Sequence, residues 1–235
     1  KMGYWVDMEN PYITYDNKYI ESVWYLLKEL YKKGLIYKGY TIQPYSPAAG
    51  TGLSTHELNQ PGCYKPVKDT TVIAQFKLVE SSKLKVESLI KNALHDNTYF
   101  LAWTTTPWTL PSNTALAVGK NIFYVAVKTY NQYTYKSIIV ILAKDLFGKY
   151  FSDKNVELKL EDYKEGDKNV PYHIIGEFKG SELGNIQYEQ LLPYAQPTDG
   201  DAFRVIIGDF VTTEDGTGIV HIAPSFGSDD FRVAK

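Results

Sequence analysis

One stretch of this 235-residue chain concentrates hydroxyl groups that could hold a reacting substrate. It runs from Trp103 to Asn113 and places threonine side chains between and beside two indoles, those of Trp103 and Trp108. These threonines are Thr104, Thr105, Thr106 and Thr109. Because a hydroxyl both donates and accepts hydrogen bonds, such a group can hold an ester carbonyl, a ribose and a water together. The alternative is a strand edge with solvated threonines, since threonine is a common strand residue.

A second stretch, residues 216–231, carries one histidine and two adjacent aspartates. Its apolar run predicts a strand that ends at His221, and the loop that follows leads to Asp229 and Asp230. Taken alone, a histidine at a strand end is more often structural than catalytic. Paired aspartates after Ser228 are likewise more often part of a helix cap than of a catalytic site. The stretch therefore gains meaning only in combination with the threonines.

Other catalytic signatures fail. His56 and Glu57 open like a zinc-protease motif, but the second histidine is replaced by Gln60. The sequence has no Gly-x-Ser-x-Gly elbow, and the glycines around Thr217 lack the lysine of a phosphate loop. Four scattered histidines and one cysteine argue against a zinc site. The sequence implies no metal and no cofactor.

Composition and charge bound the function classes. The 25 basic and 27 acidic residues give a net charge of -2, so no global positive field attracts nucleic acid. Any nucleic-acid contact must be local, or supported by other parts of a longer protein. The longest strongly apolar run, residues 138–143, is far shorter than the roughly 20 residues of a membrane helix. A single cysteine excludes an intrachain disulfide and indicates a reducing, cytoplasmic location.

The elements that must position these residues are mostly strands. Helical spacing predicts an amphipathic helix over 17–33, capped by Asp16 and stopped at Gly34. A strand over 35–42 and a loop over 44–66 follow. Alternation and turn residues then predict strands at 70–78, 98–104, 114–118, 122–130, 133–142, 172–180, 204–213 and 217–222. Helices are predicted at 84–94 and 143–150, and Asp215 with Gly216 predicts a tight hairpin turn.

These elements define an α+β, β-rich class, with a barrel or sandwich, peripheral helices and an N-terminal helical arm. Composition divides the chain into an arm at 1–66 and a β-rich domain at 67–235, together expected to behave as one structural unit. No signal segment follows Lys1, and from its first and last residues we expect the chain to be a piece of a larger protein. We expect it to be monomeric and to have no membrane partner.

Together, segments 104–113 and 216–224 with Asp230 resemble the editing (CP1) domain of isoleucyl-tRNA synthetases. The arm segments 3–7, 21–24, 33–37 and 53–54 fit the region that leads into that domain. Thr106 stands where leucyl and valyl editing domains typically have arginine. The tail 223–232 resembles eukaryotic-type enzymes, because Phe226 replaces a histidine common in bacterial ones. The His-x-Gly-His and Lys-Met-Ser-Lys-Ser signatures of amino-acid activation are absent, so the fragment should not charge tRNA.

The resemblance implies a β-barrel that hydrolyses valine misattached to isoleucine tRNA. One methylene yields only about 1–3 kcal/mol of discrimination, a limit for which the isoleucyl enzyme is itself the standard example, so a second, hydrolytic sieve is needed. Asp230 would pair with the α-ammonium group of the substrate. His221 would reject the larger side chain by its bulk, and Thr105 and Thr106 would position the ester and the attacking water.

Further roles are implied for the neighbours of these residues. Thr104 and Thr109 would support the polar cradle, Trp103 and Trp108 would form or support its walls, and Asn113 matches a motif position connected with editing. The implied substrates are valyl-tRNA(Ile) and valyl-adenylate, and the implied partners are the tRNA acceptor end and the remainder of the parent synthetase. The alternatives are a valyl- or leucyl-type editing domain, an insert that grips the acceptor end without hydrolysis, or an unrelated ligand-binding barrel.

Overall fold

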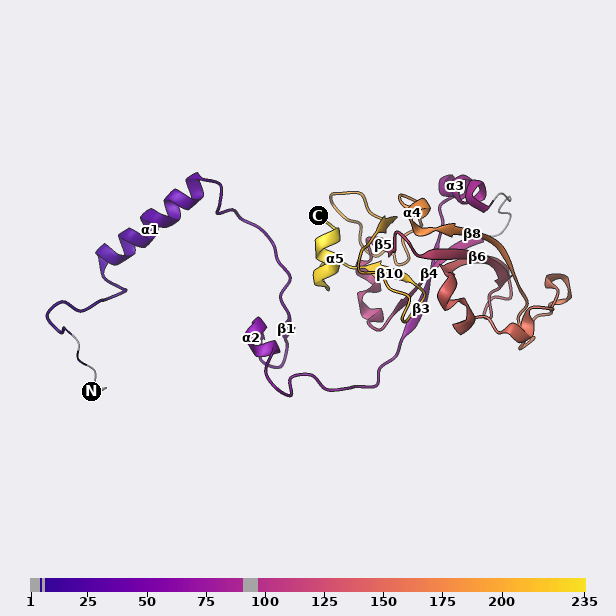
Figure 1. The fold of residues 1–235 in the computed structure, drawn as a ribbon, viewed down its shortest axis with the longest axis horizontal. Helices are drawn as coiled ribbons and strands as arrows, with labels where there is room; N and C mark the ends of the chain where they lie inside the picture. The colour runs from indigo at the N-terminus through magenta and orange to yellow at the C-terminus, as the bar shows by residue number, and fades with distance from the viewer. Residues whose placement is uncertain (1–4, 6, 91–96) are drawn as a thin grey trace. The chain divides into compact units, whose positions relative to one another are not determined.

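The computed structural model describes residue 5, residues 7–90 and residues 97–235, and it consists of two units. The first unit is Lys1–Thr41 and the second is Ile42–Lys235. Figure 1 shows the course of the chain through both. The division between residues 66 and 67 that composition suggests stays a prediction. Part of the arm segment 3–7 lies outside the described residues.

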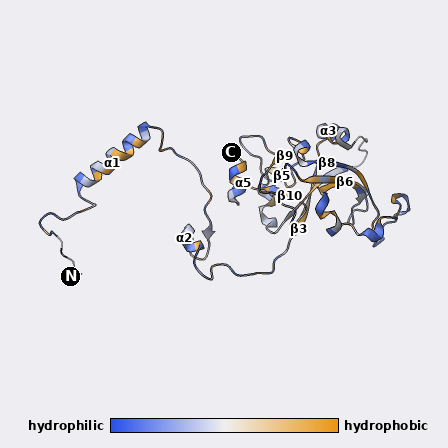
Figure 2. Ribbon diagram, in the orientation of Figure 1, coloured by the Kyte–Doolittle hydropathy of each residue, from blue (hydrophilic) through white to orange (hydrophobic). Residues whose placement is uncertain are grey.

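The first unit is built around helix α1, Asn17–Lys32. The carboxylate of Asp16 accepts a hydrogen bond from the backbone N–H of Lys18 at 2.8 Å, which caps the N-terminus as predicted. The helix ends before Gly34, whose φ of +69° suits a glycine. Hydrophilic and hydrophobic residues alternate along α1 (Figure 2), and none of its residues is buried.

The strand predicted over 35–42 is wrong, because these residues form neither a strand nor a helix. Their apolar and aromatic residues are typical of a strand, but a strand also needs a hydrogen-bonded partner. The predicted loop over 44–66 contains two short strands and a one-turn helix. These are β1 (Tyr45–Ser46), paired antiparallel with β2 (Thr51–Gly52), and α2 (Thr55–Leu58).

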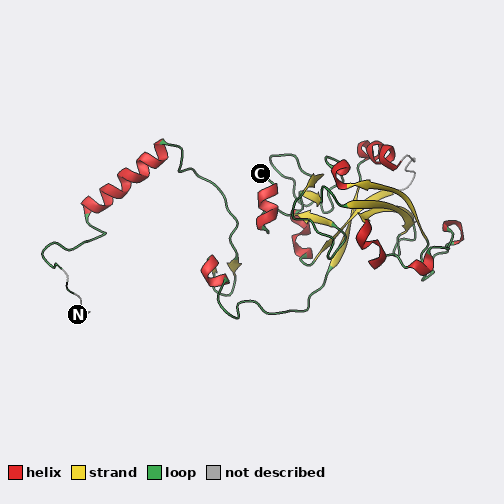
Figure 3. Cartoon of the chain, in the orientation of Figure 1, coloured by secondary structure: helices red, strands yellow, loops and turns green. Residues whose placement is uncertain are grey.

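The larger sheet of the second unit has five strands in the order β3-β4-β7-β6-β8. Its members are β3 (Val72–Lys77), β4 (Asn97–Thr104), β6 (Phe123–Tyr130), β7 (Ser137–Ala143) and β8 (Tyr172–Lys179). The β4–β7 pair is parallel and the other pairs are antiparallel. This sheet brings the predicted strands 70–78, 98–104, 122–130, 133–142 and 172–180 together (Figure 3).

The smaller sheet has three strands in the order β10-β5-β9. They are β5 (Ala115–Val118), β9 (Arg204–Ile207) and β10 (Ile219–Ile222). The two flanking strands lie on opposite sides of β5, so the hairpin predicted at Asp215 and Gly216 is wrong. The described strands form separate sheets and no closed barrel, which corrects the barrel expectation. The α+β class itself is confirmed.

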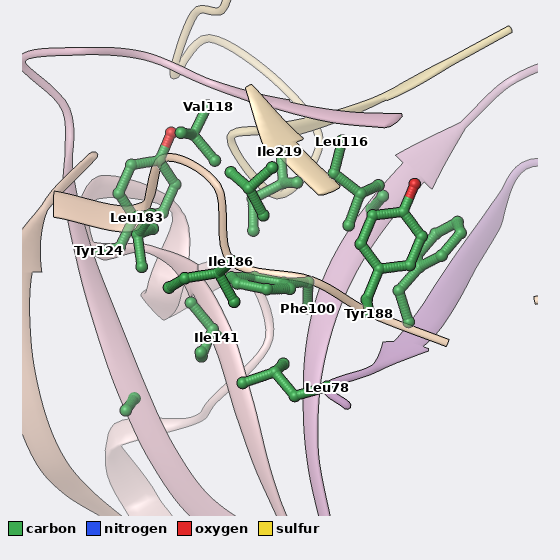
Figure 4. Close-up of a cluster of buried hydrophobic side chains, with 14 of the residues drawn as sticks. Leu78, Phe100, Leu116, Val118, Tyr124, Ile141, Leu183, Ile186, Tyr188 and Ile219 are labelled. Atoms are coloured by element: carbon green, nitrogen blue, oxygen red, sulfur yellow. The ribbon is translucent and has the colours of Figure 1, made fainter. Parts of the chain in front are cut away.

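The main core lies where the two sheets face each other. Phe100 and Ile141 from the larger sheet share one buried cluster with Leu116 and Ile219 from the smaller sheet. Figure 4 shows these side chains meeting, with Tyr188 at one end of the group. Each fully buried side chain of this kind stabilises the fold by roughly 1.5–3 kcal/mol. The main core therefore holds β10 against β4. These two strands carry His221 and Thr104, which belong to the candidate site described below.

Helical segments lie between the strands. The predicted helix 84–94 is observed as α3 (Glu80–Ile90), and residues 91–94 lie outside the described residues. The predicted helix 143–150 is the 3₁₀ helix η2 (Lys144–Lys149). The other segments are η1 (Pro107–Ser112), η3 (Asp153–Asn155), η4 (Leu160–Asp162), α4 (Gly180–Leu183) and α5 (Ser228–Val233). Within the described ranges, no helix has the length and apolar character needed to cross a bilayer.

Candidate functional site

The threonine segment changes from strand to 3₁₀ helix at the point where its hydroxyls gather. Strand β4 ends at Thr104, and η1 begins at Pro107, where a missing backbone N–H costs nothing. The turn closes through the backbone N–H of Thr109, which donates to the carbonyl of Thr106 at 3.0 Å. A strand end followed by a tight turn therefore folds the threonines into one group.

The hydroxyls of three threonines lie within hydrogen-bonding distance of one another. The Oγ1 atom of Thr106 lies 3.3 Å from that of Thr104 and 3.4 Å from that of Thr109. The backbone N–H of Thr106 also donates to Thr104 Oγ1 at 3.0 Å. Thr104 and Thr109 are buried, whereas Thr105 and Thr106 are exposed. The buried pair therefore supports a surface that the exposed pair presents to solvent.

His221 reaches this group from the smaller sheet. Its Nε2 atom lies 2.8 Å from Thr109 Oγ1, and its side chain is only 8% exposed. The hydroxyl of Thr109 donates to the carbonyl of Thr106 at 2.8 Å, which leaves the lone pairs of its oxygen to accept a hydrogen bond from the imidazole. Burial lowers the pKa of His221, and the negative charge of Asp230 offsets part of that effect.

Asn113 and Tyr188 complete the contacts of the imidazole. The amide Nδ2 of Asn113 lies 3.5 Å from His221 Nδ1 and donates to the carbonyl of Ala115 at 2.9 Å. The hydroxyl of Tyr188 donates to Asn113 Oδ1 at 2.7 Å. Sequence reasoning missed Tyr188, because its segment carries no motif and its burial becomes visible only in the fold.

The two adjacent aspartates have different partners. Asp230 is half-buried, and its Oδ1 accepts a hydrogen bond from the backbone N–H of Ala223 at 2.8 Å. Asp229 pairs with Arg232 at 3.2 Å, and Arg232 also pairs with Asp209 at 2.8 Å. The Arg232 guanidinium holds the pKa of Asp209 below its usual value. Asp230 therefore has no arginine partner like that of Asp229 among the contacts described, and its charge acts on His221.

Trp103 and Trp108 lie in different surroundings. Along β4, Phe100 and Ala102 face the main core, so Thr104 lies on that face and Trp103 on the opposite one. A Cβ atom placed on Gly216 would lie 3.0 Å from the Trp103 ring, so the indole packs on this glycine. Trp108 is 60% exposed on η1. The structure thus places Trp103 on the face of β4 opposite Thr104 and leaves Trp108 exposed on η1.

A cavity of about 770 Å³ lies on the face of β10 that points away from the main core. Ile222, Pro224 and Phe231 contribute to its lining, and Ile222 points away from the main core, whereas Ile219 packs into it. Since side chains alternate along a strand, His221 faces the threonines and not this cavity. Among the described residues, no three histidine, cysteine, aspartate or glutamate side chains gather as metal ligands.

The sequence, including the threonine segment 103–113, matches a known family of proteins. The family model of class I tRNA synthetases (I, L, M and V) matches residues 1–162, and the chain belongs to this family. Over all 235 residues it is 67% identical to the isoleucine–tRNA ligase of Cytophaga hutchinsonii and 66% identical to that of Bacteroides fragilis. It is 48% identical to that of Clostridium tetani.

The chain spans about a fifth of the length of these relatives, covering 20% of the first two and 19% of the third. The relatives are bacterial, which corrects the eukaryotic-type expectation. That expectation depended on Phe226, which is 57% exposed in a loop where packing does little to restrict the residue type.

Two solved structures are similar to part of the chain. The cytosolic leucyl-tRNA synthetase editing domain of P. knowlesi has a TM-score of 0.47 at 13% identity, with 68% of this chain and 60% of that chain covered. The corresponding domain of P. falciparum has a TM-score of 0.48 at 12% identity, with 68% and 63% covered.

Proposed function

We propose that this chain is the proofreading part of an isoleucine–tRNA ligase and hydrolyses valine wrongly esterified to isoleucine tRNA. The observation that carries the proposal is the meeting of the threonine hydroxyls with His221, whose ring lies 2.8 Å from Thr109. The charge of the half-buried Asp230 carboxylate also acts on this ring. Valyl-adenylate is a second substrate with the same aminoacyl group. The similarity to isoleucine–tRNA ligases favours this specificity over a valyl or leucyl type.

Asp230 binds the α-ammonium of the misattached amino acid. The Ala223 N–H contact uses Oδ1 and leaves further acceptor capacity on the carboxylate, because an ionised carboxylate has about four lone-pair sites. A charge-assisted hydrogen bond to the ammonium would use that capacity. Asp229 is the weaker candidate, since Arg232 already neutralises it.

Thr105 and Thr106 hold the ester carbonyl, the terminal ribose and the attacking water. Both are exposed, and Thr106 is held from two sides by the buried hydroxyls of Thr104 and Thr109. An ester is activated enough that fixed positioning of water supplies much of the rate. A hydroxyl of the substrate's own ribose assists, so no protein side chain has to act as a strong base.

His221 excludes isoleucine by its bulk and does not act as a general base. A base needs a free lone pair within reach of the water. In His221 the Nε2–H donates to Thr109, and Nδ1 lies against the amide of Asn113. The ring is therefore committed to the protein on both sides and serves as a fixed wall. Trp108 supplies an exposed aromatic surface beside it.

The tRNA acceptor end carries the substrate into this site, in the cytoplasm. With a net charge of -2, the chain supplies few phosphate contacts, and the rest of the parent ligase supplies the others. The 235-residue chain works as a monomer and at high concentrations of aminoacyl-tRNA.

Deacylation of valyl-tRNA(Ile) by the 235-residue chain tests the proposal. We expect the wild-type chain to release valine and Asp230→Ala to abolish release, because the ammonium loses its anchor. Asp229→Ala is the matched control, since it removes a neighbouring carboxylate of the same helix and should keep most of the activity. Binding of tRNA without release of valine by the wild-type chain would instead identify a gripping insert.

A further inference from the structure

Tyr188 occupies a position that its packing holds firmly. Its ring is 2% exposed and meets the edges of Phe76 and Phe203, with centroid distances of 5.3 and 6.2 Å. Its backbone N–H donates to the carbonyl of Phe203 at 3.0 Å. With both ring and backbone fixed, the hydroxyl of Tyr188 has one place to point, which is toward Asn113.

The amide of Asn113 is consequently fixed in one orientation. Its Oδ1 accepts from the Tyr188 hydroxyl at 2.7 Å, and its Nδ2 donates to the carbonyl of Ala115 at 2.9 Å. Turning the amide over would place Oδ1 against the Ala115 carbonyl, which can only accept, and would take away the acceptor to which the Tyr188 hydroxyl donates. The Ala115 carbonyl therefore selects the orientation in which Nδ2 faces His221, and the Tyr188 hydroxyl holds the Oδ1 end of the amide in place.

This orientation decides where the imidazole carries its proton. The amide Nδ2 is a donor and lies 3.5 Å from His221 Nδ1, so Nδ1 presents its lone pair. The proton is then on Nε2, where it is donated to Thr109 Oγ1 at 2.8 Å. At the far end, the hydroxyl proton of Thr109 is donated to Thr106. One directed chain of hydrogen bonds thus runs from Tyr188 to the threonine turn.

We propose that Tyr188 is a positioning residue that acts through Asn113 to hold His221 in its neutral, Nε2-protonated form, and so sets the position of Thr109 and Thr106. The effect of Tyr188 on hydrolysis rests on the proposed function. The effect of Tyr188 on the protonation form of His221 does not depend on that function. A purely structural tyrosine would fill the same space with no effect on the imidazole.

Nitrogen NMR of the histidine rings in the 235-residue chain tests the proposal, because the two ring nitrogens report which one carries the proton. We expect wild-type His221 to be protonated on Nε2 alone. Tyr188→Phe keeps the packed ring and removes the hydroxyl, and it should produce a mixture of the two tautomers. Asn113→Asp replaces the amide donor with an acceptor and should move the proton to Nδ1.

Tyr124→Phe is the matched control. The hydroxyl of Tyr124 is also buried and donates to the carbonyl of Gly218 at 2.7 Å, but no link of the chain includes it. It should lower stability as Tyr188→Phe does and leave the His221 tautomer unchanged. In valyl-tRNA hydrolysis, Tyr188→Phe should lose about five- to tenfold in kcat relative to Tyr124→Phe, the effect expected for one misplaced hydrogen bond.

The outcomes separate the two proposals. A wild-type His221 protonated on Nδ1 would overturn the role of Tyr188 without any variant having to fold. An unchanged tautomer in both Tyr188→Phe and Asn113→Asp would do the same. If the wild-type chain releases no valine but the tautomer shifts as expected, the proposed function fails and the positioning role of Tyr188 stands.

Discussion

The hydroxyl of Thr109 lies 2.8 Å from the Nε2 atom of His221, although the two residues are 112 positions apart in the chain. One comes from the turn after β4 and the other from β10, and the main core holds these strands together. The contact gives the imidazole a fixed position, so a change at either residue has consequences at the other.

Shortening His221 should relax the exclusion of isoleucine. His221→Ala removes the wall and leaves room beside Thr109 for a larger aliphatic side chain. We expect hydrolysis of isoleucyl-tRNA(Ile) to rise at least about tenfold over wild type, which corresponds to a barrier lowered by about 1.4 kcal/mol. Deacylation assays with both aminoacyl-tRNAs measure it. His173→Ala, on β8, is the control and should keep isoleucyl-tRNA intact. Intact isoleucyl-tRNA with His221→Ala would refute the steric role.

Two threonines should separate stability from activity. Thr109→Val keeps the shape but leaves the buried Nε2–H of His221 without its acceptor, at a cost of about 1–3 kcal/mol of unfolding free energy. Thr106→Val changes an exposed hydroxyl and should cost under about 0.5 kcal/mol. Yet Thr106→Val should lower the kcat for valyl-tRNA at least about tenfold, because the water loses its positioning group. Urea unfolding and deacylation, run on the same samples, distinguish the two effects.

Gly227 should be needed for the placement of Asp230. A Cβ atom at this position would collide with the Asp230 carboxylate Oδ2. Gly227→Ala should therefore displace the carboxylate and raise the KM for valyl-tRNA with little change in fold. Gly148→Ala is the control, because nothing lies within 4 Å of a Cβ placed there. Equal KM values for the two variants would show that the carboxylate is not placed by Gly227.

The sequence predicted a helix or strand correctly where one local residue pattern is enough to determine the structure. The strand predicted over 122–130 is observed as Phe123–Tyr130, because an apolar run between turn residues has few other solutions. The strand predicted over 35–42 is wrong because a strand-like residue pattern does not supply a partner strand. The closed barrel failed for a related reason, since periodicity identifies strands but not which edges pair.

The candidate site also has residues that the sequence indicates and residues that only the fold reveals. The threonines and Asp230 stood out by residue type, but the burial of Thr104 and Thr109 next to the exposed Thr106 depends on how the chain folds. Trp103 could not be separated from Trp108 until the β4 register placed its indole on the face opposite Thr104. Tyr188 lacked any signal, because its role depends on one hydroxyl reaching Asn113 across 75 positions of sequence.

Acid should weaken the fold through His221. Burial holds its pKa in the folded chain below the ordinary value of 6.5, and the charge of Asp230 only partly offsets this. Below pH 6.5 the unfolded chain therefore binds more protons at this residue than the folded chain. The contribution of neutral His221 to the unfolding free energy is therefore fully present above pH 6.5. As the pH falls from 6.5 to the pKa of His221 in the folded chain, the unfolding free energy decreases by up to about 1.4 kcal/mol per pH unit. Urea unfolding between pH 7.5 and 5 should show this slope in wild type, and His221→Gln should flatten it. His173→Gln should keep the wild-type slope, and a His221→Gln curve parallel to wild type would contradict the assignment.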